Sequence, residues 1–261
     1  MKFFDGVPDR LVAARMRSFE PTGALALFSV LHFAGVAVIG GLAAAAAPIL
    51  AAGLPLALAL NLVFSTIVYR LLRTSPPFTF AHDKLGACNV VTHLRGSLAA
   101  LLAMPLAAPQ ALADPAVGWA VFGLGLTVLC LDGVDGWLAR RGGMASAFGA
   151  RFDLEVDSLL ALALAALALA GGAAGPAVLV LGLARYAFWA ASLVLPWLAA
   201  PLPPRFSRKA VCVVQLGTLL ALQAPVLPAP VGHAAAFAAA GLLAWSFWVD
   251  IRWLSARAAR S

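Results

Sequence analysis

Charged residues are scarce in this chain. Only 11% of its 261 residues are Asp, Glu, Lys or Arg, whereas 63% are hydrophobic and the mean hydropathy is +0.95. A soluble domain of this size cannot have that composition, because it would lack the polar surface that contact with water requires. The shortage of charge therefore excludes a soluble globular protein and indicates an integral membrane protein.

Cysteine is also rare, and its spacing excludes further kinds of structure. The three cysteines, Cys88, Cys130 and Cys212, lie far apart in or beside apolar segments. Because they form no closely spaced pair, we expect small packing residues rather than disulfides or zinc ligands. The sequence has no internal repeat, so the inverted repeat that is typical of many secondary transporters is missing. The four histidines are spread along the chain, and we expect no histidine cluster.

Long apolar runs fill most of the sequence, and runs of about 18 or more apolar residues predict transmembrane helices. We place eight such helices at 24–46, 49–72, 88–108, 117–140, 150–172, 174–198, 208–226 and 233–253. The predicted fold is therefore all-α and polytopic. Charged residues such as Asp5 and Asp9 precede the first run and argue against a signal peptide, and residues 8–19 fit a short amphipathic helix on the membrane surface.

Lys and Arg are absent from alternate loops between these runs, although the net charge is +7. The loops near 47–50, 109–116, 171–176 and 226–232 contain neither residue. The basic residues gather on the other side, which the positive-inside rule places in the cytoplasm; Arg95 is counted among them. Basic residues beside an anionic leaflet need no nucleic acid as partner. We expect membrane lipids as partners, no nucleic acid, and a bacterial inner membrane as the location.

Four aspartates interrupt the apolar sequence: Asp132, Asp135, Asp153 and Asp157. Spacings of three and four residues place each pair on one helix face, about 4.5–6 Å apart along the axis. The connection at 141–148 folds the chain back, so the two pairs can meet. A carboxylate inside a membrane helix costs roughly 2.5–3.5 kcal/mol, and four of them require compensation. A cluster of oxygen ligands favours two Mg²⁺ or Mn²⁺ ions.

The residues around these aspartates suit a phosphate-bearing ligand. Gly136 and Ala139 leave room beside the backbone, while Arg140 and Arg151 supply positive charge for phosphate oxygens. The N-terminus of the fifth predicted helix adds the positive end of a dipole. Helix caps or interfacial ion pairs would explain a single aspartate as well, but four at these spacings favour a functional site.

One protein family has the same arrangement of residues. The chain resembles the signature of the CDP-alcohol phosphotransferases at Asp132-x-x-Asp135-Gly136-x-x-Ala139-Arg140 and Gly149-x-x-x-Asp153-x-x-x-Asp157. The resemblance covers about residues 84–253 and implies a core of six transmembrane helices, two divalent metal ions and a homodimer. It also implies transfer of a phosphatidyl group from CDP-diacylglycerol to a hydroxyl acceptor, with release of CMP. We therefore expect a catalytic core at 84–261, preceded at 1–83 by a surface segment and two additional helices.

The resemblance also assigns roles to individual residues. It implies that Asp132, Asp135, Asp153 and Asp157 bind the metal ions, and that Asp157 deprotonates the acceptor hydroxyl. An upstream element, Asn89-Val-Val-Thr92-x-x-Arg95, is similar to the Asn-x-x-Thr element of the family, although a helix N-cap explains it too. The residues that the resemblance places near the nucleotide are Asn89, Thr92, Gly136, Arg140, Ser146 and Gly149.

The acceptor is defined by fewer residues. Arg185 lies in the middle of the sixth predicted helix, where a polar cavity or snorkelling to the interface must accommodate its charge. Arg208 and Lys209 loosely resemble the Gly-Lys-x-Lys-Thr element of phosphatidylglycerophosphate synthases, but also suit interfacial anchors. If all three bind the acceptor, it carries a phosphate, with glycerol 3-phosphate ahead of inositol phosphate. A small alcohol such as serine or choline, an ion-coupled transporter and an inactive scaffold are the alternatives. Glu155 lies on a different helix face from the aspartates, and we expect it to pair with a cytoplasmic arginine.

Overall fold

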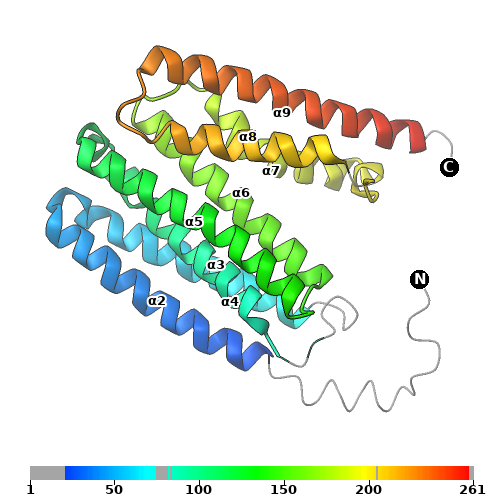
Figure 1. The fold of residues 1–261 in the computed structure, drawn as a ribbon, viewed down its shortest axis with the longest axis horizontal. Helices are drawn as coiled ribbons and strands as arrows, with labels where there is room; N and C mark the ends of the chain where they lie inside the picture. The colour runs from blue at the N-terminus through cyan, green and yellow to red at the C-terminus, as the bar shows by residue number, and fades with distance from the viewer. Residues whose placement is uncertain (1–20, 75–81, 83, 204, 259–261) are drawn as a thin grey trace.

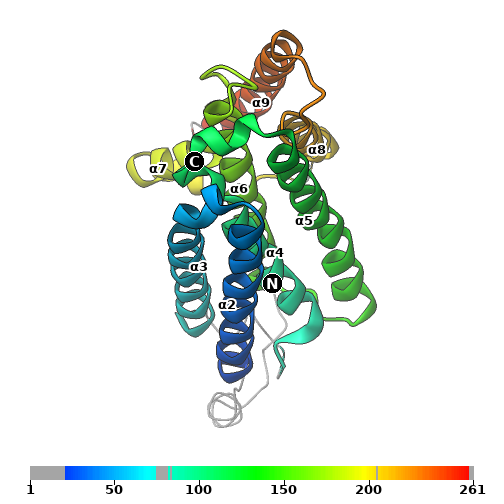
Figure 2. The ribbon, with the colours of Figure 1, turned by 90° about the vertical axis from the view of Figure 1, so that its left-hand side faces the viewer.

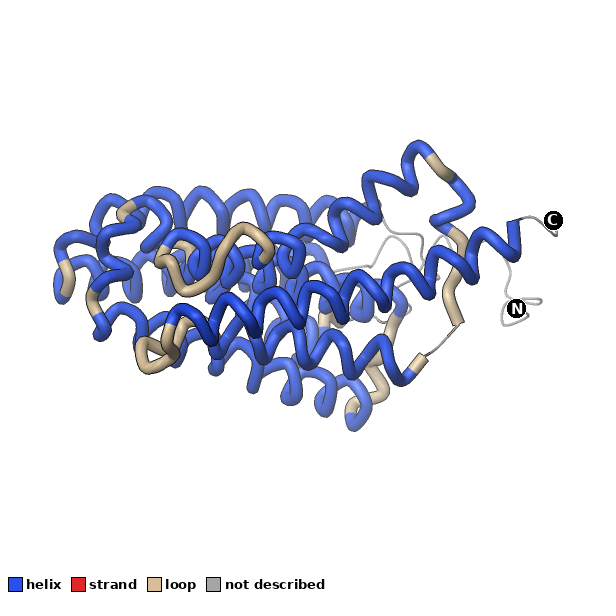
Figure 3. Tube along the Cα trace, turned by 90° about the horizontal axis from the view of Figure 1, so that it is seen from above, coloured by secondary structure: helices blue, strands red, loops and turns tan. Residues whose placement is uncertain are grey.

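Helices account for nearly all of the described part of the chain. The structure is a computed structural model, and it describes residues 21–74, 82, 84–203 and 205–258. The surface helix that we predict at 8–19 and most of the connector before residue 84 lie outside these residues. No strand occurs within the described ranges (Figure 3). The all-α class that the apolar runs predict is confirmed.

Eight α-helices follow one another through the described residues and form an elongated bundle (Figure 1). They are α2 (Pro21–Ala46), α3 (Leu54–Thr74), α4 (Gly86–Leu102), α5 (Pro115–Arg141), α6 (Ala147–Ala170), α7 (Val178–Val194), α8 (Phe206–Ala221) and α9 (Ala229–Ala258). Short 3-10 helices in the connections are η1 (Pro48–Gly53), η2 (Met104–Ala107), η3 (Pro109–Ala113) and η4 (Pro196–Ala199). Each α-helix overlaps one of the eight predicted spans.

Five of these segments are long and apolar enough to cross a membrane by themselves. They comprise α2, η1 with α3, α4 with η2, α5 and α9. The helices α7 and α8 have 17 and 16 residues, which is shorter than the roughly 20 residues that a 30 Å hydrocarbon core requires. Because several apolar spans lie in one helical bundle, the chain is a polytopic membrane protein.

The turn between α5 and α6 follows from its local sequence. The helix α5 ends at Arg141, and Gly143 two residues later has a φ of 62°. Glycine adopts this left-handed conformation without a steric penalty, so the chain can turn away from the helix axis there. Ser146 then begins α6, and its Oγ accepts a hydrogen bond from the N–H of Gly149 at 3.0 Å. Because this turn is short, the end of α5 lies beside the start of α6, and the two predicted aspartate pairs face each other.

The largest apolar core surrounds α6, which lies in the middle of the bundle (Figure 1). Leu160 and Leu164 of this helix are fully buried, together with Val128 of α5 and Leu219 of α8. The start of α6 carries Asp153 and Asp157, so the carboxylates belong to the central helix. The buried apolar residues further along α6 hold this helix in place, and with it Asp153 and Asp157.

The N-terminal helices α2 and α3 pack against α4 (Figure 2). At the far end of the bundle, a Cβ on Gly53 would lie only 2.1 Å from the carbonyl oxygen of Met104, so the two backbones are in direct contact there. At the other end, Leu25 and Val68 belong to a buried cluster that also includes Phe152 of α6. The boundary that we predict at residue 84 stays a prediction, but the two parts share buried surface along their length.

Asn61 of α3 leads to a prediction about stability. Its side chain is fully buried, and neither its amide nitrogen nor its amide oxygen has a hydrogen-bond partner among the described residues. A buried polar group without a partner costs about 1–3 kcal/mol. We predict that Asn61→Leu raises the melting temperature of the purified protein.

A matched control exists for this experiment. Gln223 is also a buried amide, but its Nε2 donates hydrogen bonds to the carbonyl oxygens of Leu164 at 3.0 Å and Leu219 at 2.9 Å. Gln223→Leu should therefore lower the melting temperature. If Asn61→Leu lowers it as well, the amide of Asn61 is hydrogen-bonded, for example to buried water.

Candidate functional site

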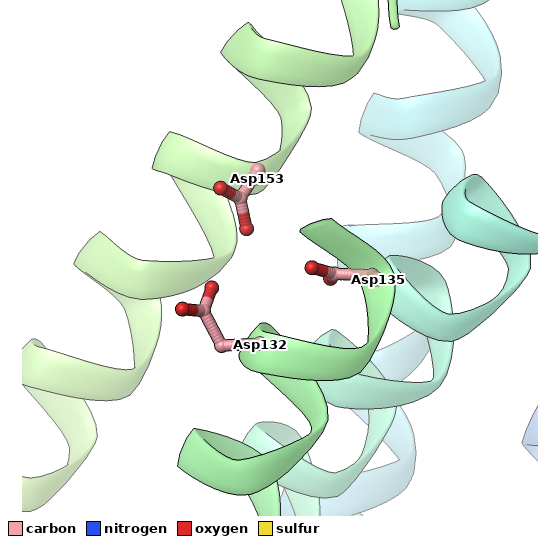
Figure 4. Close-up of side chains that lie close together, drawn as sticks. All are labelled: Asp132, Asp135 and Asp153. Atoms are coloured by element: carbon pink, nitrogen blue, oxygen red, sulfur yellow. The ribbon is translucent and has the colours of Figure 1, made fainter. Parts of the chain in front are cut away.

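Three of the four aspartates form a group that could hold a metal ion. Asp132 and Asp135 project from α5 and Asp153 from α6, and one ligand oxygen from each lies within 4.8 Å of the others. Figure 4 shows the side chains of Asp132 and Asp153 pointing into the space between the two helices, with Asp135 beside them. Asp132 and Asp135 precede the turn between α5 and α6 by about two helical turns, and Asp153 follows it by about two; the structure brings all three together.

Arg95 of α4 connects all four carboxylates. Its Nη1 lies 2.8 Å from Asp135 and 2.5 Å from Asp153, and its Nη2 lies 2.8 Å from Asp132 and 2.5 Å from Asp157. Its Nε donates a hydrogen bond to the carbonyl oxygen of Val128 at 3.2 Å. The side chain is fully buried. This guanidinium therefore compensates part of the charge and aligns the carboxylates of α5 and α6.

Arg95, which we count among the basic residues of the cytoplasmic side, is fully buried. The helix α4 begins at Gly86, which places Arg95 in its third turn and inside the bundle. Sequence analysis missed its role because the residue lies close to the start of a predicted span. Its spacing of three residues from Thr92 was a usable signal, since residues three apart share a helix face.

The chemistry of the cluster fits divalent cations. Four carboxylates face one guanidinium, so formal negative charge exceeds positive charge in a site that lies inside a membrane bundle. Carboxylate oxygens are hard ligands, and Mg²⁺ and Mn²⁺ prefer them to softer donors. The residues present therefore fit the metal ions that the sequence pattern predicts.

Thr92 and Asn89 line the same region of α4. The Oγ1 of Thr92 donates to a carboxylate oxygen of Asp135 at 2.9 Å, so Thr92 is part of the carboxylate cluster. The Nδ2 of Asn89 donates to the carbonyl oxygen of Leu85 at 2.6 Å. The alternative that this element is a helix N-cap is wrong, because Leu85 is the N-cap residue and makes no capping side-chain bond.

Three residues that we predict near the nucleotide meet at the start of α6. A Cβ on Gly149 would lie 3.1 Å from the Oγ of Ser146 and 3.3 Å from the Oδ1 of Asn89, so any side chain there would crowd both groups. On α5, a Cβ on Gly136 would lie 3.2 Å from an Nη of Arg140. The glycines thus keep space beside polar groups, as a ligand that approaches the backbone requires.

Arg185 is compensated by an ion pair. Its Nη2 lies 2.5 Å from the Oε1 of Glu155 on α6, and both side chains are about one-third exposed. Glu155 therefore does pair with an arginine, but with Arg185 on α7 and not with one of the arginines that we count on the cytoplasmic side. This ion pair accommodates part of the charge of Arg185, and the remaining exposure leaves its guanidinium accessible.

Arg208 pairs with an acidic residue that sequence analysis missed. Its Nε and Nη2 donate to the two carboxylate oxygens of Asp250 on α9, both at 3.0 Å, and Arg205 contacts the same carboxylate at 3.3 Å. Lys209 is exposed beside this group. The cysteines are free, as expected, although Cys130 is exposed and is not a packing residue.

The prediction that the histidines do not cluster is wrong. The Nδ1 atoms of His32 and His93 lie 2.7 Å apart, and the Nε2 of His93 is within hydrogen-bond distance of Ser29 at 3.1 Å and Ser65 at 3.2 Å. This polar group joins α2 and α3 to the face of α4 that points away from the carboxylates. The contact could not be found from the sequence, because its members lie up to 64 residues apart.

Comparison with known proteins supports the resemblance in the sequence. The family model for CDP-alcohol phosphatidyltransferase matches residues 85–250, which is well over half of the chain. The match begins at the start of α4 and ends within α9, so it includes the four aspartates. Searches of curated proteins and of solved structures gave no match. On the strength of the family match, this chain belongs to the CDP-alcohol phosphatidyltransferase family.

Proposed function

We propose that the protein is a membrane enzyme that transfers a phosphatidyl group from CDP-diacylglycerol to a hydroxyl acceptor and releases CMP. The family match supports a transferase that uses a CDP-alcohol. The observation that carries the proposal is the set of four aspartates at the family spacing, which converge from α5 and α6 around Arg95. An ion-coupled transporter would instead need polar residues near both membrane faces.

Asp132, Asp135 and Asp153 are the residues that would hold the divalent ions, with Asp157 contributing to the second. Bound ions supply neutralisation of charge on the diphosphate and on the departing CMP. The nucleotide would lie near Asn89, Ser146 and Gly149, at the N-terminal end of α6, which is the positive end of the helix dipole. Arg140 and Thr92 would complete the nucleotide site, with Gly136 leaving room beside the backbone.

Asp157 is the residue that we assign as general base. It contacts Arg95 through Oδ1, and its side chain is 20% exposed, so it is accessible from outside the protein interior. It removes the proton from the acceptor hydroxyl, and that oxygen attacks the phosphorus bonded to diacylglycerol. The phosphorus–oxygen bond to CMP breaks, and CMP leaves with the electron pair.

A phosphorylated polyol such as glycerol 3-phosphate is the acceptor that we propose. Arg208 lies in the first turn of α8, which packs against α6, and Arg185 pairs with a glutamate of α6 that is two residues from both Asp153 and Asp157. A guanidinium has five N–H donors, so a carboxylate partner leaves donors for a phosphate. Lys209 would add a third positive charge. Inositol phosphate, serine and choline are the other candidates.

The two residues of the Arg185–Glu155 ion pair distinguish these acceptors. We predict that Arg185→Gln raises the KM for a phosphorylated acceptor by about 10- to 100-fold, because a charge-assisted contact to phosphate is worth roughly 1.5–3 kcal/mol. Glu155→Gln breaks the same ion pair but keeps the guanidinium, so the KM should stay the same or fall. Equal effects of the two substitutions on KM would contradict acceptor binding by Arg185.

The experiment that tests the function uses purified protein in lipid nanodiscs with CDP-diacylglycerol and either Mg²⁺ or Mn²⁺. Each acceptor is added separately, CMP is quantified, and the lipid product is identified by mass spectrometry. We expect one acceptor to yield a new phospholipid, and chelation of the metal to stop the reaction. Binding of CDP-diacylglycerol without CMP release for any acceptor would contradict the proposed reaction.

We also propose that the site faces the cytoplasm of a bacterial cell and that the enzyme is a homodimer. Arg140 and Arg141 lie at the end of α5 next to the site, whereas the opposite end of the bundle around 109–116 has no basic residue. The positive-inside rule then orients the site toward the cytoplasm. The homodimer rests on the family resemblance alone.

A further inference from the structure

One aromatic side chain of α3 contacts both α4, which carries Arg95, and α6, which carries Asp153 and Asp157. Phe64 of α3 is buried, and its ring centroid lies 5.2 Å from that of His93 on α4 and 6.1 Å from that of Phe152 on α6. A Cβ on Gly96 would lie 2.0 Å from the tip of the same ring. The ring of Phe64 therefore rests directly on the backbone of α4 while it stacks on α6.

Each of these contacts involves the immediate neighbour of a site residue. His93 follows Thr92, Gly96 follows Arg95, and Phe152 precedes Asp153. Successive helical residues are about 100° apart around the axis, so these neighbours point to one side of the site rather than into it. Phe64 consequently contacts α4 and α6 beside the site, next in sequence to Arg95 and Asp153.

We propose that Phe64 is a positioning residue, which sets the separation of α4 and α6 and thereby the fit between Arg95 and the carboxylates of Asp153 and Asp157. Two charge-assisted contacts cross this interface, from Arg95 to Asp153 and to Asp157, and their strength depends on distance and angle. Through Phe64, the N-terminal helix α3 would help to position the carboxylates of the site. The effect on catalysis rests on the proposed function.

Two further groups of contacts hold Phe64 in place. Below it, Val68 and Leu72 of α3 belong to one buried cluster with Phe148, Phe152 and Val156 of α6. The hydroxyls of Ser29 and Ser65 both lie within hydrogen-bond distance of the Nε2 of His93, so they orient the ring against which Phe64 packs. Interiors packed in this way transmit a change in volume to their neighbours instead of absorbing it.

The first test needs neither activity nor metal. Melting temperatures are measured in EDTA for Phe64→Ala, Arg95→Gln and the double variant. If Phe64 sets the position of Arg95, the loss of Arg95 lowers the melting temperature less in the Phe64→Ala background than in the parent chain. Phe64→Leu, which keeps more of the packing, replaces Phe64→Ala if the latter does not fold.

Phe188 provides the matched control for this cycle. Its ring lies 5.5 Å from that of Phe247, and the pair joins α7 to α9 rather than α4 to α6. We expect Phe188→Ala to lower the melting temperature by itself, and its effect to add to that of Arg95→Gln. Additive shifts for Phe64→Ala as well would overturn the proposal, because Phe64 would then only contribute packing.

The second test measures the Mn²⁺ affinity of the purified protein after substitution of Gly96, which lies against the ring of Phe64. Gly96→Ala forces the ring of Phe64 away from α4. We expect Mn²⁺ to bind roughly tenfold more weakly, the lower end of the effect seen when partners that orient metal ligands are lost. Adding Phe64→Leu to Gly96→Ala removes the ring tip and should restore part of the affinity.

The outcomes separate this inference from the proposed function. Unchanged Mn²⁺ binding in Gly96→Ala, or no recovery in the double variant, would overturn the role of Phe64. Failure of the parent chain to bind Mn²⁺ would contradict the proposed metal site instead, and the melting-temperature cycle in EDTA would still decide whether Phe64 positions Arg95.

Discussion

Asp157→Asn lowers CMP release by about 10²- to 10⁴-fold, the contribution that a positioned general base makes to a reaction. Asparagine has the same shape as aspartate but cannot accept the proton of the acceptor hydroxyl. The contact to the Nη2 of Arg95 involves an oxygen that an amide also offers, so the chain should still fold. The measurement is the rate of CMP release at saturating CDP-diacylglycerol and metal, together with the melting temperature.

Asp114→Asn is the matched control for this substitution. Asp114 caps α5 at the opposite end of the helix, where its Oδ1 accepts a hydrogen bond from Ala116 at 2.8 Å. Asparagine is an equally good N-cap residue, so this variant removes a carboxylate far from the site and keeps the cap. We expect its activity to match that of the parent chain. Similar activity of Asp157→Asn and Asp114→Asn would exclude Asp157 as the base.

Arg95→Gln lowers the free energy of unfolding by about 3–5 kcal/mol, the cost of removing one partner from a buried ion pair. The side chains of Asp135 and Asp157 are only 5% and 20% exposed, and they account for most of this loss. Asp132 and Asp153 are 44% and 39% exposed, so solvent screens their contacts and they contribute less. Denaturation of the purified protein, followed in EDTA, measures the effect.

Added Mg²⁺ provides a second readout for Arg95. Because the carboxylates of Arg95→Gln lack their shared cation, Mg²⁺ should restore part of the lost stability. Arg208→Gln is the control: it also removes an arginine from a carboxylate, but Asp250 keeps a contact with Arg205. We expect a smaller loss there and no recovery with Mg²⁺. An unchanged stability of Arg95→Gln would show that the guanidinium does not hold the four carboxylates together.

The helices could be predicted because their signal is local. A membrane span needs about 20 consecutive apolar residues, and each predicted run overlaps one helix of the described structure. Local chemistry also explains particular helix ends, such as Asp114 before Pro115 at the start of α5 and Ser146 at the start of α6. The meeting of the two aspartate pairs follows from their spacing and from the short turn between α5 and α6.

Contacts between distant segments could not be predicted in the same way. Periodicity shows which residues share a helix face, but it does not show which faces of separate helices meet. The pairing of Arg208 with Asp250 joins positions 42 residues apart, and the contact of His32 with His93 joins positions 61 residues apart. Arg95 was misplaced for a related reason, because its side chain is recognisable as internal only once α4 is packed between α3 and α5.

The number of Mn²⁺ ions bound per chain tests the central claim most directly, namely that the converging aspartates form a metal-dependent catalytic centre. The measurement is an equilibrium titration of the purified protein with Mn²⁺ in the presence of CDP-diacylglycerol, followed by electron paramagnetic resonance. We expect two ions per chain in the parent protein, and loss of at least one of them in Asp153→Asn. Absence of specific Mn²⁺ binding, or an unchanged number of ions in Asp153→Asn, would contradict the account.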